Sequence, residues 1–209
     1  MPLPMERFKV FISHATVEDG KLVNWMANAL DRLHIRAFIY ERYPLGGRNR
    51  FEHIKTMIRV CPYFLVLLTR AGTASQWVNQ EIGYAVGAGK TPIPIIEVDS
   101  TTGRHIKSSG FVELHDPIDY YRNSEVRLMA SVIYTFYGWL KPEGQWQGSI
   151  FLSCKCGNEF NGELDFVKWW EIWQADPQRK TFPIIWHCEK CQRAIKLSFP
   201  DCHPLAQQD

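Results

Sequence analysis

A serine, a tryptophan and a glutamate are grouped at Ser75, Trp77 and Glu81, where the chain leaves an apolar run and enters a stretch with helical spacing. Trp77 and Glu81 are four residues apart, so on a helix they share one face. Ser75 is a suitable N-cap, because its hydroxyl can accept a hydrogen bond from an unpaired amide of the first turn. A carboxylate beside an indole ring, one turn inside a helix, can act on a cationic or sugar substrate. A lone glutamate on a helix is usually a solvated charge, so this interpretation depends on the neighbours that the fold provides.

A second group of reactive residues is formed by cysteines. Five of the six cysteines lie in the last third of the chain, and four of them form a CxC pair and a CxxC pair separated by 31 residues. Two close pairs at such a distance are typical of a zinc ribbon. The CxC pair has one intervening residue instead of the usual two, and His187, Cys202 and His203 are alternative ligands. The preferred ligands are Cys154, Cys156, Cys188 and Cys191, and four thiolates would make the zinc site structural, with no open position for water.

The spacing of apolar residues predicts the elements that position these groups. We expect strands at residues 8–13, 35–40, 63–68, 91–98 and, as a short fifth strand, 111–114. We expect helices at residues 19–33, 51–60, 75–86 and 123–140, and a turn of small residues at 70–74. Strands that alternate with helices predict a mainly parallel sheet covered on both faces, here an α/β fold of the doubly wound, flavodoxin-like type. The prolines of the fourth strand indicate that its start lies at an edge or is unpaired.

In such a sheet, ligands bind beyond the carboxyl ends of the strands. Ser13, His14 and Ala15 follow the first strand, and their backbone amides and the Ser13 hydroxyl can bind phosphate or ribose near a helix start. The alternative is that Ser13 or Thr16 caps the first helix. Tyr40 ends the second strand, where its ring can stack on a base or serve a structural purpose.

Composition limits the class of protein. A length of 209 residues exceeds the usual single domain of about 100 to 150, which indicates one full domain and a small appendage. The chain is 45% hydrophobic and 22% charged with a net charge of +2, as is ordinary for a soluble globular protein. It contains no apolar run of the roughly 20 residues that cross a bilayer, and its first residues lack the apolar core of a signal peptide. We therefore expect a cytoplasmic protein that does not contact a membrane.

Four segments, in this order, resemble a Toll/interleukin-1 receptor (TIR) domain of the prokaryotic type. They are VFISHATVED at 10–19, ERYPLGGRNRFEHI at 41–54, YFLVLLTRAGTASQWVNQEIGYA at 63–85 and TPIPII at 91–96. The resemblance covers roughly residues 8–140, about two thirds of the chain. We expect a TIR domain at 1–142 and a zinc-ribbon-like domain at 149–209, joined by a linker rich in Pro, Gly and Gln.

This resemblance implies an activity on NAD+. Many TIR domains cleave the bond between nicotinamide and ribose, and their required glutamate lies in a Ser-x-Trp-x-x-x-Glu motif, matched here by Ser75, Trp77 and Glu81. Nicotinamide leaves as a neutral molecule, so the carboxylate is needed to stabilise the oxocarbenium character of the ribose and not to supply a proton. The second product is ADP-ribose when water attacks, or a cyclic isomer when a group of the same molecule attacks. Trp77 is a candidate ligand, or it packs and positions the helix.

The resemblance also implies self-association and closure of the site through the loop at residues 41–50. This loop contains the Gly46-Gly47 pair, together with Arg48 and Arg50, which can bind phosphate or remain solvated. By resemblance the protein would act in prokaryotic defence or signalling. The competing hypothesis is a non-enzymatic TIR adaptor or scaffold that recruits partners.

The C-terminal region does not have the charge of a nucleic-acid-binding domain. Residues 149–209 contain seven Lys/Arg against eight Asp/Glu, and four thiolates on Zn²⁺ would add negative charge, so binding to nucleic acid is not expected. The region is instead rich in tryptophan, with Trp169, Trp170, Trp173 and Trp186. These side chains either fill a thin core or form a face for a protein partner or ligand.

Overall fold

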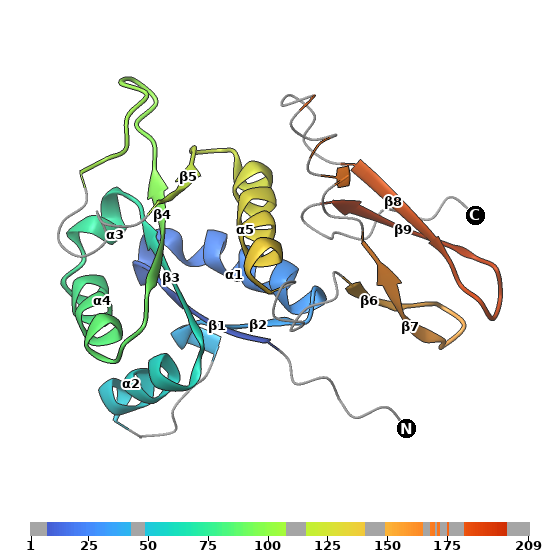
Figure 1. Ribbon diagram of the computed structural model, residues 1–209, viewed down its shortest axis with the longest axis horizontal. Helices are drawn as coiled ribbons and strands as arrows, with labels where there is room; N and C mark the ends of the chain where they lie inside the picture. Colours follow the sequence, from blue (N-terminus) through green and yellow to red (C-terminus); the bar gives the residue numbers. More distant parts are fainter. Residues whose placement is uncertain are drawn as a thin grey trace.

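The computed structural model describes residues 8–42, 49–107, 116–140, 149–164, 168–169, 171, 175 and 182–199. Its centre is a five-stranded sheet in the order β2-β1-β3-β4-β5, in which every neighbouring pair is parallel (Figure 1). This is the flavodoxin-like strand order, so the predicted α/β fold class is confirmed. The strands are β1 (Phe8–Ser13), β2 (Ile35–Phe38), β3 (Tyr63–Leu68), β4 (Pro92–Glu97) and β5 (Ile118–Tyr120).

Helices cover both faces of this sheet. One face carries α1 (Thr16–Arg32) and α5 (Glu125–Leu140), and the other carries α2 (Arg50–Val60) and α4 (Gln76–Gly87) (Figure 1). Two short elements complete the layer arrangement, the 3-10 turn η1 (Tyr40–Arg42) after β2 and the helix α3 (Arg70–Ala74) after β3. The helices α1 and α4 therefore begin at the edge of the sheet where the parallel strands end.

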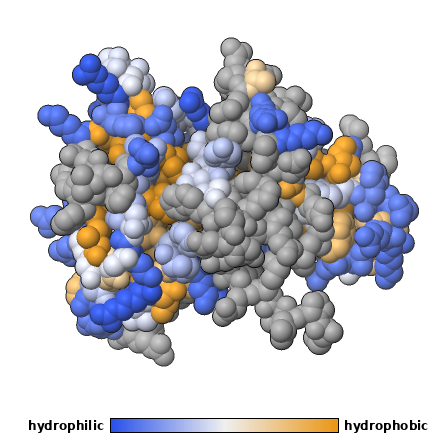
Figure 2. All heavy atoms as spheres, viewed as in Figure 1, coloured by the Kyte–Doolittle hydropathy of each residue, from blue (hydrophilic) through white to orange (hydrophobic). Residues whose placement is uncertain are grey.

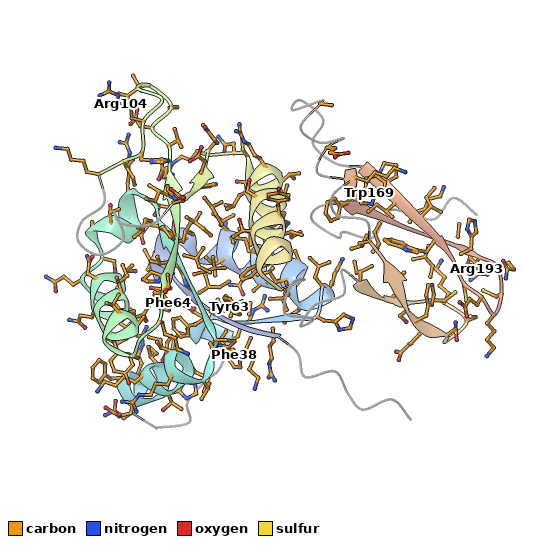
Figure 3. The ribbon with its side chains drawn as sticks, in the orientation of Figure 1. Phe38, Tyr63, Phe64, Arg104, Trp169 and Arg193 are labelled. Carbon is orange, nitrogen blue, oxygen red and sulfur yellow. The ribbon has the colours of Figure 1, made fainter. Side chains whose placement is uncertain are left out.

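Successive side chains of each strand point to opposite faces and so join different cores. On β3, Tyr63 contacts the ring of Phe136 of α5 edge-on, with centroids 6.0 Å apart, whereas Phe64 stacks on Phe11 of β1 at 5.7 Å (Figure 3). Burial on both faces explains why the sequence of β3 is apolar throughout.

The structure corrects several predicted boundaries. The fifth strand is Ile118–Tyr120, and the predicted strand at 111–114 lies outside the described residues. Residues 70–74 form a helix and not a turn, because the Thr69 hydroxyl accepts a hydrogen bond from the amide of Gly72 and caps it. Within the described residues, the start of β4 pairs with β3 alone, since β5 begins its pairing at Ile95. The prolines of β4 thus lie where the strand has one described neighbour, as their missing amides require.

Beyond α5, four strands form two antiparallel hairpins. The first joins β6 (Ser149–Ser153) to β7 (Glu159–Glu163), and the second joins β8 (Phe182–His187) to β9 (Ala194–Phe199) (Figure 1). A Cβ atom added to Gly162 of β7 would lie 2.6 Å from Nε1 of Trp186 of β8, so the indole packs directly on the glycine. Trp169 also contacts Phe199, with ring centroids 6.5 Å apart. These tryptophans fill the core of the hairpins, and Trp170 and Trp173 lie outside the residues whose side chains are described.

The described part of the surface is mostly hydrophilic at its two ends. Figure 2 shows hydrophilic residues over the outer rim of the α/β layers and over the end that carries the turn of β8 and β9, where Figure 3 places Arg193. No helix among the described residues is both long enough and apolar enough to span a bilayer.

Candidate functional site

The candidate site begins with a contact between Ser13 and Glu81. Ser13 is the last residue of β1, and its hydroxyl donates a hydrogen bond of 2.5 Å to Oε2 of Glu81 on α4. Both side chains belong to buried residues, which are 1% and 6% exposed. The helix α1 is preceded by Ala15 and has no side-chain cap, so Ser13 and Thr16 do not cap it, and the Ser13 hydroxyl is used to fix the carboxylate.

The position of Glu81 depends on where α4 begins. Ser75 is the N-cap of α4, and its hydroxyl accepts a hydrogen bond of 3.3 Å from the amide of Val78, as the sequence predicts. Starting the helix at Gln76 turns Glu81 toward the end of β1 and leaves Trp77 half-buried on the same face. In the structure, the Ser75 hydroxyl therefore serves as the cap of α4.

Burial raises the pKa of Glu81 to about 7. Loss of solvation is the largest cause, and the negative charge of Glu41 acts in the same direction. The side chains of Ser13 and Trp77 and the positive charge of Arg50 oppose it, because they favour the carboxylate. Glu81 therefore changes its charge near neutral pH, which makes any chemistry of the ionised group sensitive to pH in this range.

Two aromatic rings and an arginine lie beside this carboxylate. The guanidinium carbon of Arg50 lies 3.9 Å from the ring centroid of Tyr40 and 5.1 Å from that of Trp77. Phe51 packs edge-on against Trp77, with centroids 6.4 Å apart. The ring of Tyr40, a candidate for stacking on a base, is therefore covered on one side by the protein's own cation.

A small, partly open pocket lies between α2 and α4, with Glu81 in its wall. It is lined mainly by apolar and aromatic side chains, with an ammonium and a carboxylate among them. The hydroxyl of Tyr84, which lines the pocket, is buried and has no hydrogen-bond partner within the described ranges. An apolar pocket with a few convergent polar groups is the usual form of a small-molecule site. The lining residues are Phe51, Ile54, Lys55, Ile58, Trp77, Gln80, Glu81 and Tyr84.

His14 and Glu41 form a second polar pair at this edge of the sheet. His14 is 6% exposed, and its Nε2 lies 3.5 Å from Oε2 of Glu41, which belongs to η1. On the other side of the ring, Nδ1 lies 3.4 Å from the carbonyl oxygen of Ile12. The next residue in η1, Arg42, ties the turn to α1 through four acceptors: Asn24 Oδ1, Asn24 O, Asn28 Oδ1 and Asp31 Oδ2. Glu41 is thus held close to His14 by the anchored turn.

The structure brings most of the candidate binding residues to one edge. Tyr40 and Trp77 share the Arg50 guanidinium, and Ser13 contacts Glu81, whereas His14 contacts Glu41. Ala15 is the N-cap of α1. Arg48, with Gly46 and Gly47, lies outside the described residues.

Sequence reasoning missed Glu41, Lys55 and Tyr84. Lys55 and Phe51 are four apart on α2, a spacing that indicates a shared face, and the Lys55 ammonium lies 4.0 Å from the centroid of the Phe51 ring. Glu41 gives no comparable signal, because it follows a strand and its contact with His14 is long-range.

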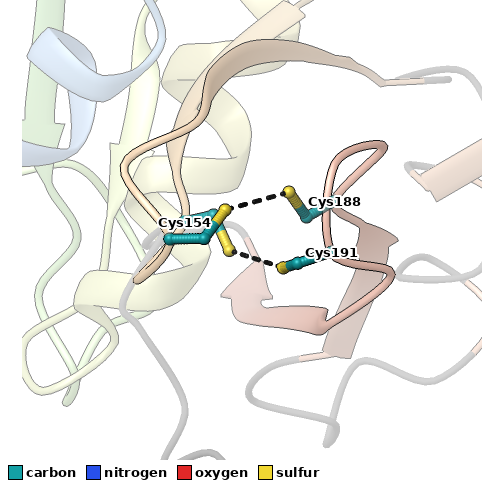
Figure 4. Close-up of side chains that lie close together, drawn as sticks. Cys154, Cys188 and Cys191 are labelled. Carbon is teal, nitrogen blue, oxygen red and sulfur yellow. Dashed lines mark hydrogen bonds between the residues drawn. The ribbon is translucent and has the colours of Figure 1, made fainter.

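The four predicted cysteine ligands come together between the two hairpins (Figure 4). Their Sγ atoms all lie within 4.8 Å of one another, with 3.5 Å between Cys154 and Cys191 and 3.6 Å between Cys156 and Cys188. A tetrahedron with Zn–S bonds of about 2.3 Å places its sulfur atoms about 3.8 Å apart, so the cluster fits a tetrahedral metal ion. Asn158 directs its side-chain amide to the sulfur of Cys188 at 3.7 Å.

The alternative ligands are not part of this cluster as the structure describes it. His187 is exposed and is absent from the group of close donor atoms, and Cys202 and His203 lie outside the described residues. The preferred set of four is therefore the set that the fold places together.

The sheet order defines a doubly wound α/β domain, and the polar groups at the carboxyl edge of its sheet form a candidate ligand site. The family model for the TIR domain matches residues 10–128, which is more than half of the chain, so the chain belongs to the TIR domain family. No curated protein sequence matches it. Among solved structures, it is similar to the TIR domains in the structure of the activated Roq1 resistosome directly recognizing the pathogen effector XopQ. That similarity has 15% identity and a TM-score of 0.42, and covers 65% of this chain and 74% of the other.

Proposed function

We propose that this protein is an NAD+ glycohydrolase that cleaves the bond between nicotinamide and ribose. The observation that carries the proposal is the buried carboxylate of Glu81, fixed by the Ser13 hydroxyl at the carboxyl edge of the sheet and open to an apolar pocket. The membership of the TIR family supports it. The products would be nicotinamide and either ADP-ribose or a cyclic ADP-ribose isomer.

The chemistry matches a single buried carboxylate. As the bond breaks, the pyridinium takes up the electron pair and leaves as neutral nicotinamide, while positive charge develops on the ribose. The carboxylate of Glu81 stabilises that charge, and its burial strengthens the effect because the local dielectric constant is low. Ionised Glu81 is the active form, so the reaction slows as the pH falls below about 7.

The remaining binding roles follow from position. The nicotinamide ring would lie beside Trp77, and the chain after β1 would lie along the ribose and phosphates through Ser13, His14 and Ala15. Tyr40 and Arg48 would contact the rest of the dinucleotide.

We further propose that the cysteine cluster holds one structural zinc ion. Four thiolates leave no open position for water, and a region as short as residues 149–209 needs a staple because it cannot build a large core alone. On this proposal residues 149–209 form a zinc-ribbon-like domain and residues 1–142 the catalytic domain. The hairpin domain would bind a protein partner or ligand that controls the enzyme.

Self-association through the TIR domain, and a role in defence or signalling, complete the proposal. The competing function is a scaffold without enzymatic activity. The discriminating experiment incubates the purified protein, over a range of concentrations that covers its assembly, with NAD+ and resolves the products by chromatography and mass. The matched variants are Glu81→Ala, which removes the proposed catalytic carboxylate, and Glu125→Gln, which removes a charge from α5 on the opposite face of the sheet.

Release of nicotinamide by the wild type and by Glu125→Gln, but not by Glu81→Ala, is the expected result. The mass of the second product then separates ADP-ribose from a cyclic isomer. No nicotinamide from the wild type at any concentration would reject the enzyme and favour the scaffold.

A further inference from the structure

A second carboxylate, that of Glu41, lies against His14, the residue that follows Ser13 at the edge of the candidate site. Glu41 belongs to η1, between Tyr40, which stacks under Arg50, and Arg42, which is fixed to α1. It is also close enough to Glu81 for its charge to raise the pKa of that residue. The turn therefore presents Glu41 to the same edge of the sheet as Glu81, from the opposite side of β1.

The ring of His14 faces the Glu41 carboxylate. The Nε2 atom of His14 is buried and has no hydrogen-bond partner within the described ranges, and the Oε2 atom of Glu41 lies 3.5 Å from it. When Nε2 carries the ring proton, a small movement of the carboxylate makes this contact a hydrogen bond. With the proton on Nε2, this atom is a buried donor without another described acceptor, and the movement is favoured because leaving the donor unpaired costs free energy.

The two carboxylates differ in their exposure to solvent, and this difference suits them to different roles. Glu81 is 6% exposed, so it is shielded from water and suited to stabilise charge. The Glu41 side chain is 27% exposed, so it reaches the solvent from which a nucleophile arrives. Pairs of carboxylates in contrasting surroundings commonly divide the work of stabilising charge and accepting a proton.

We propose that Glu41 is the general base of the reaction and that His14 is the residue that positions it. In hydrolysis, the oxygen of water forms a bond to the anomeric carbon of the ribose as the bond from that carbon to nicotinamide breaks. The electron pair of the broken bond remains on the nicotinamide nitrogen. The water proton passes to the Glu41 carboxylate and is later released to solvent. For a cyclic product, the attacking hydroxyl of the substrate loses its proton to Glu41 in the same way. This inference rests on the proposed NAD+ cleavage.

The first test uses Glu41→Gln and an anionic nucleophile. The amide keeps the size of the side chain and an oxygen that faces His14, but it cannot accept the proton, so nicotinamide release should slow by about 10²-fold. Azide needs no deprotonation. Added azide should therefore restore nicotinamide release in Glu41→Gln and yield ADP-ribosyl azide, identified by mass. A merely structural role would not be rescued in this way.

The second test addresses His14. In His14→Leu the donor to Glu41 is lost, and release should slow nearly as much as in Glu41→Gln, again with rescue by azide. In His14→Gln a side-chain N–H remains, and most of the activity should be retained. Thermal melts of each variant check that the fold is intact, and Glu125→Gln is the control for loss of one negative charge.

The outcomes separate this inference from the proposed function. A wild-type rate in Glu41→Gln, or a loss that azide does not restore in a folded variant, overturns the role of Glu41 while Glu81→Ala still establishes the glycohydrolase. If the wild type releases no nicotinamide, the proposed function and the role of Glu41 are overturned together.

Discussion

The Ser13 hydroxyl and the Glu81 carboxylate are joined by a 2.5 Å hydrogen bond across 68 positions of the sequence. One residue ends the central strand β1 and the other lies on α4, so the bond couples the sheet to the helix that carries the candidate catalytic group. Burial disfavours the negative charge of Glu81 that the proposed reaction requires, because it raises the pKa of this carboxyl to about 7. Stability and activity should therefore respond in opposite directions to changes at this position.

Replacing Glu81 with Gln should abolish activity and stabilise the protein above pH 7. The pKa of this buried carboxyl is about 7 in the folded protein, against an ordinary value of 4.5 for a glutamate. Between these values the folded state holds the proton more tightly than the unfolded state, so the free energy of unfolding of the wild type falls as the pH rises from about 4.5 to about 7. Above pH 7 the full free-energy cost of burying the ionised carboxylate is present, on the order of 3 kcal/mol. The amide of Gln avoids this cost and can still accept a hydrogen bond from Ser13.

Urea unfolding of the wild type and of Glu81→Gln at pH 4 and pH 8 measures this cost. The variant should gain stability at pH 8 and very little at pH 4. If the variant and the wild type differ in free energy of unfolding by the same amount at pH 4 and pH 8, the ionisation of Glu81 is not the cause.

Replacing Ser13 with Ala should move the pH dependence of activity. The Ser13 hydroxyl favours the ionised carboxylate, so its loss raises the pKa of Glu81 further. The acid side of the rate profile for nicotinamide release should then shift to higher pH by about one unit. An unchanged midpoint in a folded Ser13→Ala variant would contradict the assignment of that midpoint to Glu81.

Replacing Ser75 with Ala separates capping from binding. The Ser75 hydroxyl caps α4, so its loss should lower the free energy of unfolding by about 1 kcal/mol. The acid midpoint of activity should stay in place, because the Ser75 hydroxyl bonds to a backbone amide and not to Glu81. A large rise in KM for NAD+ without a loss of stability would instead assign Ser75 to the substrate.

The cysteine cluster predicts one zinc ion per chain in the purified protein. Replacement of Cys188 by Ser should remove the zinc and unfold the hairpins, because the two hairpins are joined at this cluster. Cys61 is buried in the core between the sheet and the helices α2 and α4, and it is remote in sequence from the cluster. Replacement of Cys61 by Ala should therefore leave the zinc content unchanged. Metal analysis of both variants measures this difference, and equal zinc in Cys188→Ser would exclude the site.

Gly162 should be intolerant of a side chain, and Gly83 tolerant. An added Cβ at Gly162 would lie 2.6 Å from the indole nitrogen of Trp186, whereas one at Gly83 of α4 meets nothing within 4 Å. Gly162→Ala should lower the melting temperature and loosen zinc binding, because Trp186 must move. Gly83→Ala should raise the free energy of unfolding by up to about 1 kcal/mol, since alanine favours the helix. Equal melting temperatures for the two variants would show that the indole does not pack on Gly162.

Local patterns were sufficient to predict the main layers and part of the site. Period and composition located β1, β3 and α4, and Ser75 was identified as a cap because capping depends on the next few residues alone. The cysteine pairs were found for the same reason, as each pair is a local motif. The two cysteine pairs come together because the fold places the turns of the two hairpins next to each other.

Long-range contacts could not be obtained in this way. The sequence offered no indication that the Ser13 hydroxyl would fix a carboxylate on α4 instead of capping α1, since both uses suit a serine at the end of a strand. Glu41 was missed because only the tertiary fold brings it to His14. The strand β5 was not predicted, because its three residues are too few to show a period.

The separation of Ser13 from Glu81 also determines when the site can exist during synthesis. The parallel pairing of β1 with β3 and the contact of α4 with the end of β1 both join residues far apart in sequence, and such contacts form slowly. A nascent chain that has not yet emerged past Gly87 lacks the complete α4 and therefore the site. On the proposed function, a growing polypeptide could therefore not cleave NAD+ before this contact has formed.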